Sequence, residues 1–335
     1  MSLFWFFSII ILLFNGAKDR LDIHIHAQGG LQSPAMINLY KNEVKPLKLW
    51  SRTEIKKILN RYGKHPHKKW GQNFLVDKNV LHKIIQFAEL TPQDLVIEIG
   101  PGIGVLTREI ATRSRGVLAV EIDSAMQEIL SETLAGHKNC HIIISDVLKL
   151  DLEQELSRSF EWDKQRGYKV CANIPYNITT PIIFQLLEKG SHLEYALLMV
   201  QKELAQRIKA QPNSKDYGLL TLMLQYYARV EYLMDISRNC FYPAPEVDSA
   251  LIKIQLHRPA RQLKNELGFK SLLRRAFQMR RKTILNVCWA EFRADKEIIR
   301  SYLESLGLDI NSRPESLLLE DFIRIAENWP ASLER

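Results

Sequence analysis

Four consecutive residues, Asn173-Ile174-Pro175-Tyr176, carry groups that could act on an amine of a nucleobase. The exocyclic nitrogen of a base is a weak nucleophile because its lone pair is delocalised into the ring. The Asn173 side-chain oxygen and a nearby backbone carbonyl can accept the two hydrogens of the amine, which aims the lone pair at an incoming methyl group. Pro175 restricts the backbone, and the Tyr176 ring can stack on a base that has been turned out of folded RNA. Such catalysis depends mainly on the orientation of the amine. The alternative interpretation of these four residues is a structural Asx-Pro turn with no catalytic role.

A glycine-rich turn further upstream has the features of a nucleotide-binding site. An apolar run over residues 95–99 leads into the turn GPGIG at residues 100–104, and helical periodicity follows. Glycines let the backbone turn tightly and approach a ligand closely. Glu121 lies 21 residues after Gly100, at the end of the next apolar run, where a carboxylate can accept both hydroxyls of a ribose. Asp146 follows the run after that and could accept from an adenine amine.

The spacing and charge of this turn narrow the choice of ligand. A dinucleotide site would have the pattern G-x-G-x-x-G, but Val105 and Thr107 stand where its third glycine would fall in the two possible registers. Glu98, two residues before the first glycine, suits a cationic, non-phosphorylated ligand better than a pyrophosphate. The sequence therefore favours S-adenosylmethionine as the cofactor. A structural turn or helix cap is the alternative for each of these residues taken singly.

Alternating strands and helices must position these residues. Short apolar runs predict buried parallel strands at 95–99, 116–121, 141–144, 170–172 and 196–200, with helices at 105–112, 125–134 and 181–187. This alternation is typical of a doubly wound α/β fold. Residues 226–236 and 249–256 predict a strand pair joined by a Pro-rich loop at 241–245. Helical patterns alone follow Pro259, at 265–279, 281–292, 295–305 and 315–328. We therefore expect an N-terminal extension over 1–50, a catalytic domain over 51–258 and a helical domain over 259–335.

Composition and the N-terminal residues limit the class of protein. Lys and Arg number 46 against 38 Asp and Glu, a net charge of +8 that favours a polyanionic partner. The four cysteines form no C-x-x-C pair, so we expect no metal site, no disulfide framework and a reduced, cytoplasmic protein. The apolar run over residues 2–14 is shorter than the ~20 residues of a membrane span, and no basic segment precedes it as in a signal peptide. We expect translation to begin at Met36 and no stable membrane association, with a targeting segment as the alternative.

Two basic segments are candidates for contact with phosphates. Residues 45–70 carry nine Lys and Arg against one acid, Glu54, and Ser51 with Glu54 predicts a capping box at the start of a helix. A second cluster lies in the helical region. The candidate RNA contacts are Lys68, Lys69, Arg274, Arg275, Arg280, Arg281 and Lys282. Solvated helix faces, or ion pairs of Arg280 or Lys282 that hold the two domains together, are the structural alternatives.

These motifs together resemble the bacterial small-subunit ribosomal RNA adenine dimethyltransferases, the KsgA family. The resemblance runs from about residue 69 to 330 and includes GQNFL at 71–75, QKE at 201–203, FYPAPEVDS at 241–249 and AFQMRRKT at 276–283. It implies a class I methyltransferase domain with a seven-stranded, mostly parallel sheet, followed by a small helical domain. The residues that it implies for the cofactor are Asn73, Leu75, Gly100, Gly102, Glu121, Ile122, Asp146, Val147 and Asn173. Those that it implies for catalysis are Asn173, Pro175 and Tyr176.

The resemblance also implies a reaction. The family transfers four methyl groups from S-adenosylmethionine to two adjacent adenosines near the 3′ end of 16S rRNA, within an immature small ribosomal subunit, and we expect a monomer. Residues 179–181 (TTP) and 247–250 (VDSA) favour this family over the 23S rRNA methyltransferases of antibiotic resistance. A mitochondrial relative that doubles as a transcription factor, a non-catalytic RNA-binding assembly factor and a nicotinamide enzyme are competing interpretations. Intact Glu121, Asp146, Asn173 and Tyr176 argue against lost catalysis.

Overall fold

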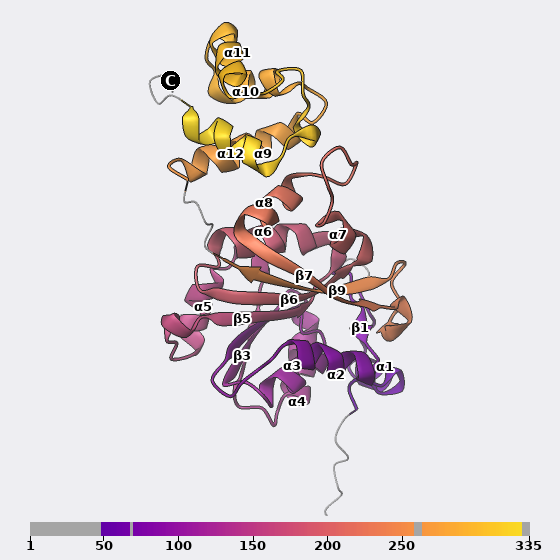
Figure 1. Ribbon diagram of the computed structural model, residues 1–335. Coiled ribbons are helices and arrows are strands. Elements are labelled where there is room, and N and C mark those ends of the chain that lie inside the picture. The colour runs from indigo at the N-terminus through magenta and orange to yellow at the C-terminus, as the bar shows by residue number, and fades with distance from the viewer. Residues whose placement is uncertain (1–47, 68–69, 258–262, 330–335) are drawn as a thin grey trace, which may run out of the picture. The chain divides into compact units, whose positions relative to one another are not determined.

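The protein is a doubly wound α/β sheet followed by a layer of helices (Figure 1). The computed structural model describes residues 48–67, 70–257 and 263–329. Most of the extension predicted over 1–50, and the predicted RNA contacts Lys68 and Lys69, lie outside these residues. Leu49 is only 1% exposed and already belongs to the apolar core.

Seven strands form the central sheet in the order β4-β3-β2-β5-β6-β9-β7. Their bounds are β2 (Leu95–Ile99), β3 (Gly116–Glu121), β4 (Cys140–Ile144), β5 (Tyr168–Asn173), β6 (Leu193–Gln201), β7 (Ala228–Ile236) and β9 (Ser249–Leu256). The strands from β2 to β6 pair in parallel, and β9 runs antiparallel to both β6 and β7. This order confirms the predicted fold class. It also places the carboxyl ends of β2, β3, β4 and β5 along one edge, where such sheets bind ligands.

Helices cover both faces of the sheet, so successive residues of a central strand face different helices. Val96 packs in an apolar cluster with Ile84 of α2, Ile110 of α3 and Ile129 of α4, whereas Ile97 packs in the cluster of the opposite face. The helices of the first face are α1 (Arg52–Arg61), α2 (Lys78–Phe87), α3 (Val105–Ala111) and α4 (Gln127–Thr133). Those of the second face are α5 (Leu152–Ser159), α6 (Thr179–Lys189), α7 (Lys202–Arg207) and α8 (Leu219–Tyr227). Single 3-10 turns are η2 (Ser124–Met126), η3 (Val147–Lys149), η4 (Lys164–Arg166), η5 (Tyr176–Ile178), η6 (Arg238–Cys240) and η7 (Pro314–Ser316).

The predicted start of α1 is confirmed, but its predicted capping box is wrong. The Ser51 side chain makes no capping hydrogen bond, and Glu54 lies 3.9 Å from Lys57 instead. The backbone N–H of Ser51, which a capping box would satisfy with Glu54, donates to the carbonyl of Lys48 at 2.8 Å. Burial of Ile55 and its apolar neighbours therefore holds this helix more than a side-chain cap does.

Two further sequence predictions need correction. Tyr226 and Tyr227, predicted to begin a strand, end helix α8, and the strand β7 begins at Ala228. The Pro-rich loop at 241–245 contains a two-residue strand, β8 (Phe241–Tyr242), which pairs antiparallel with β1 (Phe74–Leu75). This small second sheet ties the segment at 71–75 to the loop that precedes β9.

The C-terminal helices continue the apolar core of one sheet face. They are α9 (Glu266–Gln278), α10 (Ile284–Phe292), α11 (Lys296–Ser305) and α12 (Leu319–Asn328), close to the bounds predicted from sequence. One apolar cluster contains Leu220 of α8, Phe269 of α9 and Phe322 of α12. The buried Tyr217 hydroxyl donates to the carbonyl of Leu317 at 2.9 Å, which links the loop before α8 to the segment before α12.

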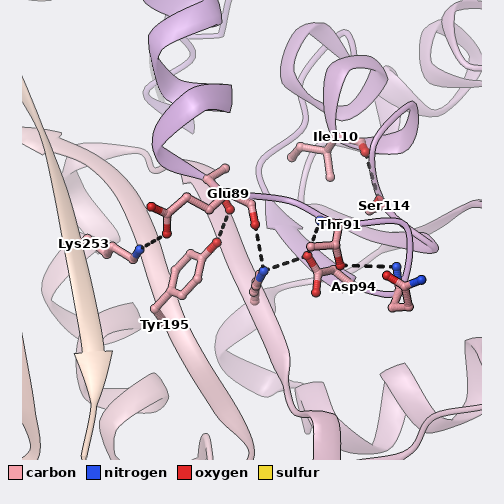
Figure 2. A network of polar contacts seen from close by, with 10 residues as sticks. Glu89, Thr91, Asp94, Ile110, Ser114, Tyr195 and Lys253 are labelled. Atoms are coloured by element: carbon pink, nitrogen blue, oxygen red, sulfur yellow. Dashed lines mark hydrogen bonds and ion pairs between the residues drawn. The ribbon is translucent and has the colours of Figure 1, made fainter.

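A polar network holds the amino ends of the strands, opposite the ligand edge (Figure 2). The Lys169 ammonium of β5 lies 2.7 Å from Asp94 and donates to the Glu89 carbonyl at 3.1 Å. Lys253 of β9 pairs with the Glu89 carboxylate at 2.8 Å. The Lys169 and Asp94 side chains are both largely buried, so each charge depends on the other. The network fixes the base of the strand that carries Asn173.

Candidate active site

A single cleft at the carboxyl ends of the parallel strands collects the predicted site. It encloses about 920 Å³, its open mouth included, which is the size of a small-molecule site. The predicted cofactor-binding and catalytic residues all line it: Asn73, Leu75, Gly100, Gly102, Glu121, Ile122, Asp146, Val147, Asn173, Pro175 and Tyr176. The fold thus brings together side chains that are as much as 103 positions apart in the chain.

The turn after β2 requires its glycines. Gly100, Gly102 and Gly104 have φ values of +74°, +57° and +84°, a region that L side chains rarely adopt. A Cβ on Gly102 would also lie 2.9 Å from the Phe74 ring of β1. Phe74 therefore packs directly against the turn, and the backbone of the turn is left open to the cleft.

Glu121 closes the turn from the end of β3. Its two carboxylate oxygens accept from the backbone N–H of Gly102 at 3.0 Å and of Asp123 at 2.9 Å. The side chain is 4% exposed, and burial raises the pKa of the Glu121 carboxyl although these two donors oppose the shift. Because each carboxylate oxygen has a second lone pair, the group can still accept from the hydroxyls of a ribose.

Glu98 is a second buried acid in the cleft. It is 2% exposed, and its Oε2 atom has no hydrogen-bond partner among the described residues. Burial, with a smaller contribution from the Glu121 charge, raises the pKa of the Glu98 carboxyl to about 8. An unpartnered buried oxygen of this kind needs a ligand to satisfy it. A cation with N–H donors, such as the amino acid end of S-adenosylmethionine, fits this requirement.

Asp146 and Val147 form the wall next to β4. The Asp146 Oδ1 atom caps η3 by accepting from the N–H of Leu148 at 3.0 Å, which leaves its Oδ2 atom for a ligand. Gln185 of α6 donates to the carbonyls of Val147 and Leu150, each at 3.0 Å. The structural and the cofactor interpretations of Asp146 are therefore compatible, since each uses a different oxygen.

The orientation of the Asn173 amide is set by a distant segment. Its Nδ2 atom donates to the backbone carbonyl of Asn73 at 2.8 Å, so its Oδ1 atom is left to act as an acceptor in the cleft. The Asn73 side chain in turn donates to the Gly71 carbonyl at 3.0 Å, and Gln72 donates to Asp123 at 2.8 Å. The segment at 71–75 thus fixes the Asn173 side chain as well as lining the cleft.

The rest of the tetrapeptide is held by two hydroxyl groups. The Tyr176 hydroxyl and the buried Ser249 hydroxyl of β9 lie 2.6 Å apart, which fixes the ring, and burial raises the pKa of the Tyr176 phenol. The Pro175 carbonyl accepts from the N–H of Ile178 at 3.1 Å and from the Thr179 hydroxyl at 3.2 Å. Because the Pro175 carbonyl already accepts these two hydrogen bonds, the carbonyl of Ile174 is the candidate backbone acceptor for a hydrogen of the target amine.

Sequence reasoning assigned no role to several residues of the site. Phe74, Ser145 and Met199 line the cleft, while Gln185 and Ser249 hold its walls from outside. Ser249 is the last residue of the motif at 241–249. The motif therefore indicated that Ser249 matters, but it did not indicate that Ser249 contacts Tyr176. Gln185 had a weaker signal, a polar residue within the apolar face of a predicted helix.

The predicted basic cluster separates into two kinds of residue. Arg274 pairs with Glu188 of α6, and Arg275 lies 3.3 Å from Glu291. Arg280 pairs with Glu315 and donates to the carbonyls of Lys215 at 2.7 Å and Ser214 at 3.0 Å. In contrast, Arg281 and Lys282 are exposed and make no ion pair among the described residues. The contacts of Arg280 support the structural alternative, in which it links the loop before α8 to the segment that contains Glu315.

Membrane-spanning helices and metal clusters are both absent from the described part of the chain. No helix within 48–67, 70–257 or 263–329 has the length and apolar composition to cross a membrane. The same ranges hold no group of three or more His, Cys, Asp or Glu side chains that could bind a metal ion.

Comparison with known proteins decides the family. The sequence pattern of the ribosomal RNA adenine dimethylase family matches residues 63–328. The chain belongs to this family. Ribosomal RNA small subunit methyltransferase A of Lachnoclostridium phytofermentans is 44% identical over 274 residues, which cover 81% of this chain and 93% of the relative. The protein of the same name from Anoxybacillus flavithermus is 41% identical over 279 residues, covering 82% and 94%.

Two solved methyltransferase structures have the same fold. A dimethyladenosine transferase from Plasmodium falciparum is 27% identical, with a TM-score of 0.63, and the match covers 75% of this chain and 95% of that structure. The 23S rRNA methyltransferase ErmE is also 27% identical, with a TM-score of 0.55, covering 76% and 98%. The predicted family, fold class and methyltransferase activity are therefore confirmed. The roles of individual residues and the domain boundaries remain predictions.

Proposed function

We propose that this enzyme dimethylates the N6 amines of two adjacent adenosines near the 3′ end of 16S rRNA. Its methyl donor is S-adenosylmethionine, and its substrate is the immature small ribosomal subunit. The observation that carries the proposal is the Asn173 amide, whose N–H group is bonded to the Asn73 carbonyl so that its oxygen is left in the cleft. The small-subunit methyltransferases that are 40–44% identical to this chain favour this RNA over 23S rRNA. We expect the enzyme to act as a monomer in the cytoplasm, where this substrate is assembled.

We assign a part of the cofactor to several residues that line the cleft. Glu121 accepts from the ribose hydroxyls, Asp146 Oδ2 accepts from the adenine amine, and the turn at 100–104 lies along the ligand. Glu98 faces the cationic end. When bound, S-adenosylmethionine supplies an electrophilic methyl group on a sulfonium. Because Glu98 and Glu121 are both buried acids, a cationic ligand also relieves the cost of ionising them.

The tetrapeptide orients the target amine. The Asn173 Oδ1 atom and the Ile174 carbonyl accept its two hydrogens, which directs the nitrogen lone pair toward the cofactor side of the cleft. The Tyr176 ring stacks on the base, and its bond to Ser249 fixes the plane of that ring. Catalysis is then orientation with no strong base, because the proton on nitrogen becomes acidic once the methyl group has been transferred.

Exposed cations position the RNA through its phosphates. In the C-terminal region Arg281 and Lys282 are exposed without an ion pair among the described residues, while the exposed Arg274 and the half-buried Arg275 are in ion pairs. On α1, basic side chains lie outward from the buried face, among them Lys56, whose ammonium is 5.2 Å from the Tyr242 ring centre. These contacts supply affinity and register, while the cleft selects the base.

The experiment is methyl transfer to purified subunits. Small subunits without the modification, large subunits and naked 16S rRNA are each incubated with enzyme and labelled S-adenosylmethionine, and the label is located by primer extension. We expect label on two adjacent adenosines of the small subunit only. Label on large subunits would instead assign the 23S activity. Binding without label would assign a non-catalytic assembly factor. Asn173→Ala, the matched control, should bind subunits with turnover reduced about 10²-fold.

A further inference from the structure

A second pocket lies beside the catalytic cleft, on the other side of the first turn of α6. Ile178 lines the cleft and Thr180 lines the second pocket, which encloses about 540 Å³ with its mouth included. Two residues span at most about 7 Å of chain, so the walls of the two pockets lie close together at the start of α6. The target base and an adjoining nucleotide of the same RNA strand can therefore reach them together.

Aromatic rings form the walls of this pocket. Phe184 of α6, Tyr217 before α8 and Phe277 of α9 all line it. Their positions are fixed, because Tyr217 and Phe277 pack edge to face with ring centres 6.3 Å apart and Phe277 also packs on Phe322. The Tyr217 hydroxyl is used in its bond to Leu317. Tyr217 is buried, whereas Phe184 and Phe277 are half-buried and held in place from behind, so these two rings offer a surface on which a planar base can stack.

One cation at the mouth is left for a ligand. Arg280 also lines the pocket, but its guanidinium is bonded to Glu315 and to the carbonyls of Ser214 and Lys215. Arg207, the last residue of α7, is exposed, and its guanidinium has no ion-pair or hydrogen-bond partner among the described residues. Guanidinium groups bind phosphate through two parallel N–H donors.

We propose that this pocket binds a nucleotide that adjoins the adenosine being methylated, with its base against Phe277 and Phe184 and its phosphate on Arg207. This inference rests on the proposed function, because it takes single-stranded RNA as the substrate. Aromatic walls alone would suit many apolar ligands. A free guanidinium at the mouth and an opening next to the catalytic tetrapeptide together favour the nucleotide. The pocket would hold the strand in register while its neighbour is turned into the cleft.

Gly218 provides a way to fill the pocket without removing any of its groups. A Cβ on Gly218 would lie 3.9 Å from the Arg207 Nη2 atom and 4.0 Å from the Phe277 Cδ1 atom, so it meets no clash. Its φ of −170° is extended backbone that any residue adopts. Gly218→Leu should therefore occupy the space between the guanidinium and the ring. Gly218→Ala is the matched variant that adds little volume.

The probe is a fluorescein-labelled pentaadenylate RNA, and binding is measured by anisotropy over a range of salt concentrations. Gly218→Leu and Arg207→Gln should each bind about tenfold more weakly, the effect of losing one stacked base or its phosphate contact. Arg207→Gln should also flatten the log–log salt dependence by about 0.7, whereas Gly218→Leu should leave the slope unchanged. Lys209→Gln removes a neighbouring exposed charge outside the pocket and should stay within about twofold of wild type at the lowest salt.

Wild-type affinity in both Gly218→Leu and Arg207→Gln would overturn the proposal, and thermal melting checks that each variant is folded. The same variants are then assayed with small subunits, where the KM for subunits should rise about tenfold. If wild-type enzyme methylates subunits and the variants show normal KM, the proposed nucleotide-binding role of the pocket is refuted and the proposed function is supported. If wild-type enzyme methylates no small subunit while pentaadenylate binding follows the expected pattern, the proposed function fails and the pocket stands.

Discussion

Glu98 should make both stability and cofactor binding depend on pH, and Glu98→Gln isolates that effect. Burial raises the pKa of the Glu98 carboxyl to about 8, from an ordinary value of 4.5. Between these values the folded protein holds a proton that the unfolded chain releases. The free energy of unfolding therefore falls as the pH rises through this window, by about 1.4 kcal/mol per pH unit. From about pH 5 to pH 9 the loss from this one carboxyl is about 4 kcal/mol.

The assay is urea unfolding of wild type and Glu98→Gln across that pH range. Glutamine has the shape of the protonated acid and does not ionise, so titrating groups that do not interact with Glu98 cancel in the difference. We expect the free energy of unfolding of the variant, relative to that of wild type, to rise by about 1.4 kcal/mol per pH unit up to about pH 8. Above that pH the difference should stay constant. If the free energies of unfolding of the two proteins changed in parallel with pH, Glu98 would titrate as an ordinary carboxyl and the raised pKa would be refuted.

The same carboxyl links cofactor binding to pH. If the cationic cofactor requires ionised Glu98, wild-type affinity should rise about tenfold per pH unit between pH 6 and 8 and level off above that. Glu98→Gln should show affinity that does not change with pH. Calorimetry in two buffers of different ionisation enthalpy would count the released proton. A comparison with S-adenosylhomocysteine, which lacks the sulfonium, identifies the cation that Glu98 serves.

Four further predictions test other parts of the site and fold. Glu121→Ala should weaken S-adenosylmethionine binding by about 1.5–3 kcal/mol, the contribution of a charge-assisted hydrogen bond. A binding titration with unchanged affinity would remove Glu121 from the site. Asn173→Ala should lower kcat about 10²-fold with subunit binding retained, and full activity would end the proposed mechanism. Asp94→Asn should cost about 3–5 kcal/mol of stability in urea unfolding, because it leaves a buried lysine unpaired, while cofactor affinity holds. Arg281→Gln should flatten the salt dependence of subunit binding with normal melting, whereas Arg280→Gln should lower the melting temperature; the reverse pattern would exchange their roles.

The strands that carry the cofactor turn could be predicted closely from sequence. Both β2 (Leu95–Ile99) and β3 (Gly116–Glu121) have the bounds that their apolar runs indicate. The reason is physical, since a parallel strand between two helical layers is buried on both faces and is mostly apolar, although β2 also buries Glu98. The strand β3 ends at the polar residue Glu121, which lines the cleft at the carboxyl edge of the sheet.

Contacts between distant segments could not be predicted in this way. Tyr226 has a high strand propensity, and its place in α8 follows from packing against Phe269 of a later helix. The pairing of β1 with β8 joins two-residue strands, which are too short for any periodicity. The Asn73 carbonyl that orients Asn173 is a backbone atom 100 residues away, and no side-chain pattern marks it. The ion pairs of the basic cluster were equally hidden, because sequence shows charge but not its partner.

Helix α6 connects the parts of the site that sequence motifs treat as separate. Its first turn holds the catalytic tetrapeptide, because the Thr179 hydroxyl donates to the Pro175 carbonyl. Two turns later Gln185 donates to the carbonyls of Val147 and Leu150, next to the cleft wall that contains Asp146. Near its end Glu188 pairs with Arg274 of the C-terminal helices. In the proposed mechanism, RNA bound against the C-terminal helices is therefore linked through α6 to the residues proposed to hold the methyl donor and the target amine. We expect this link to need no conformational change, because α6 already contacts all three parts of the site.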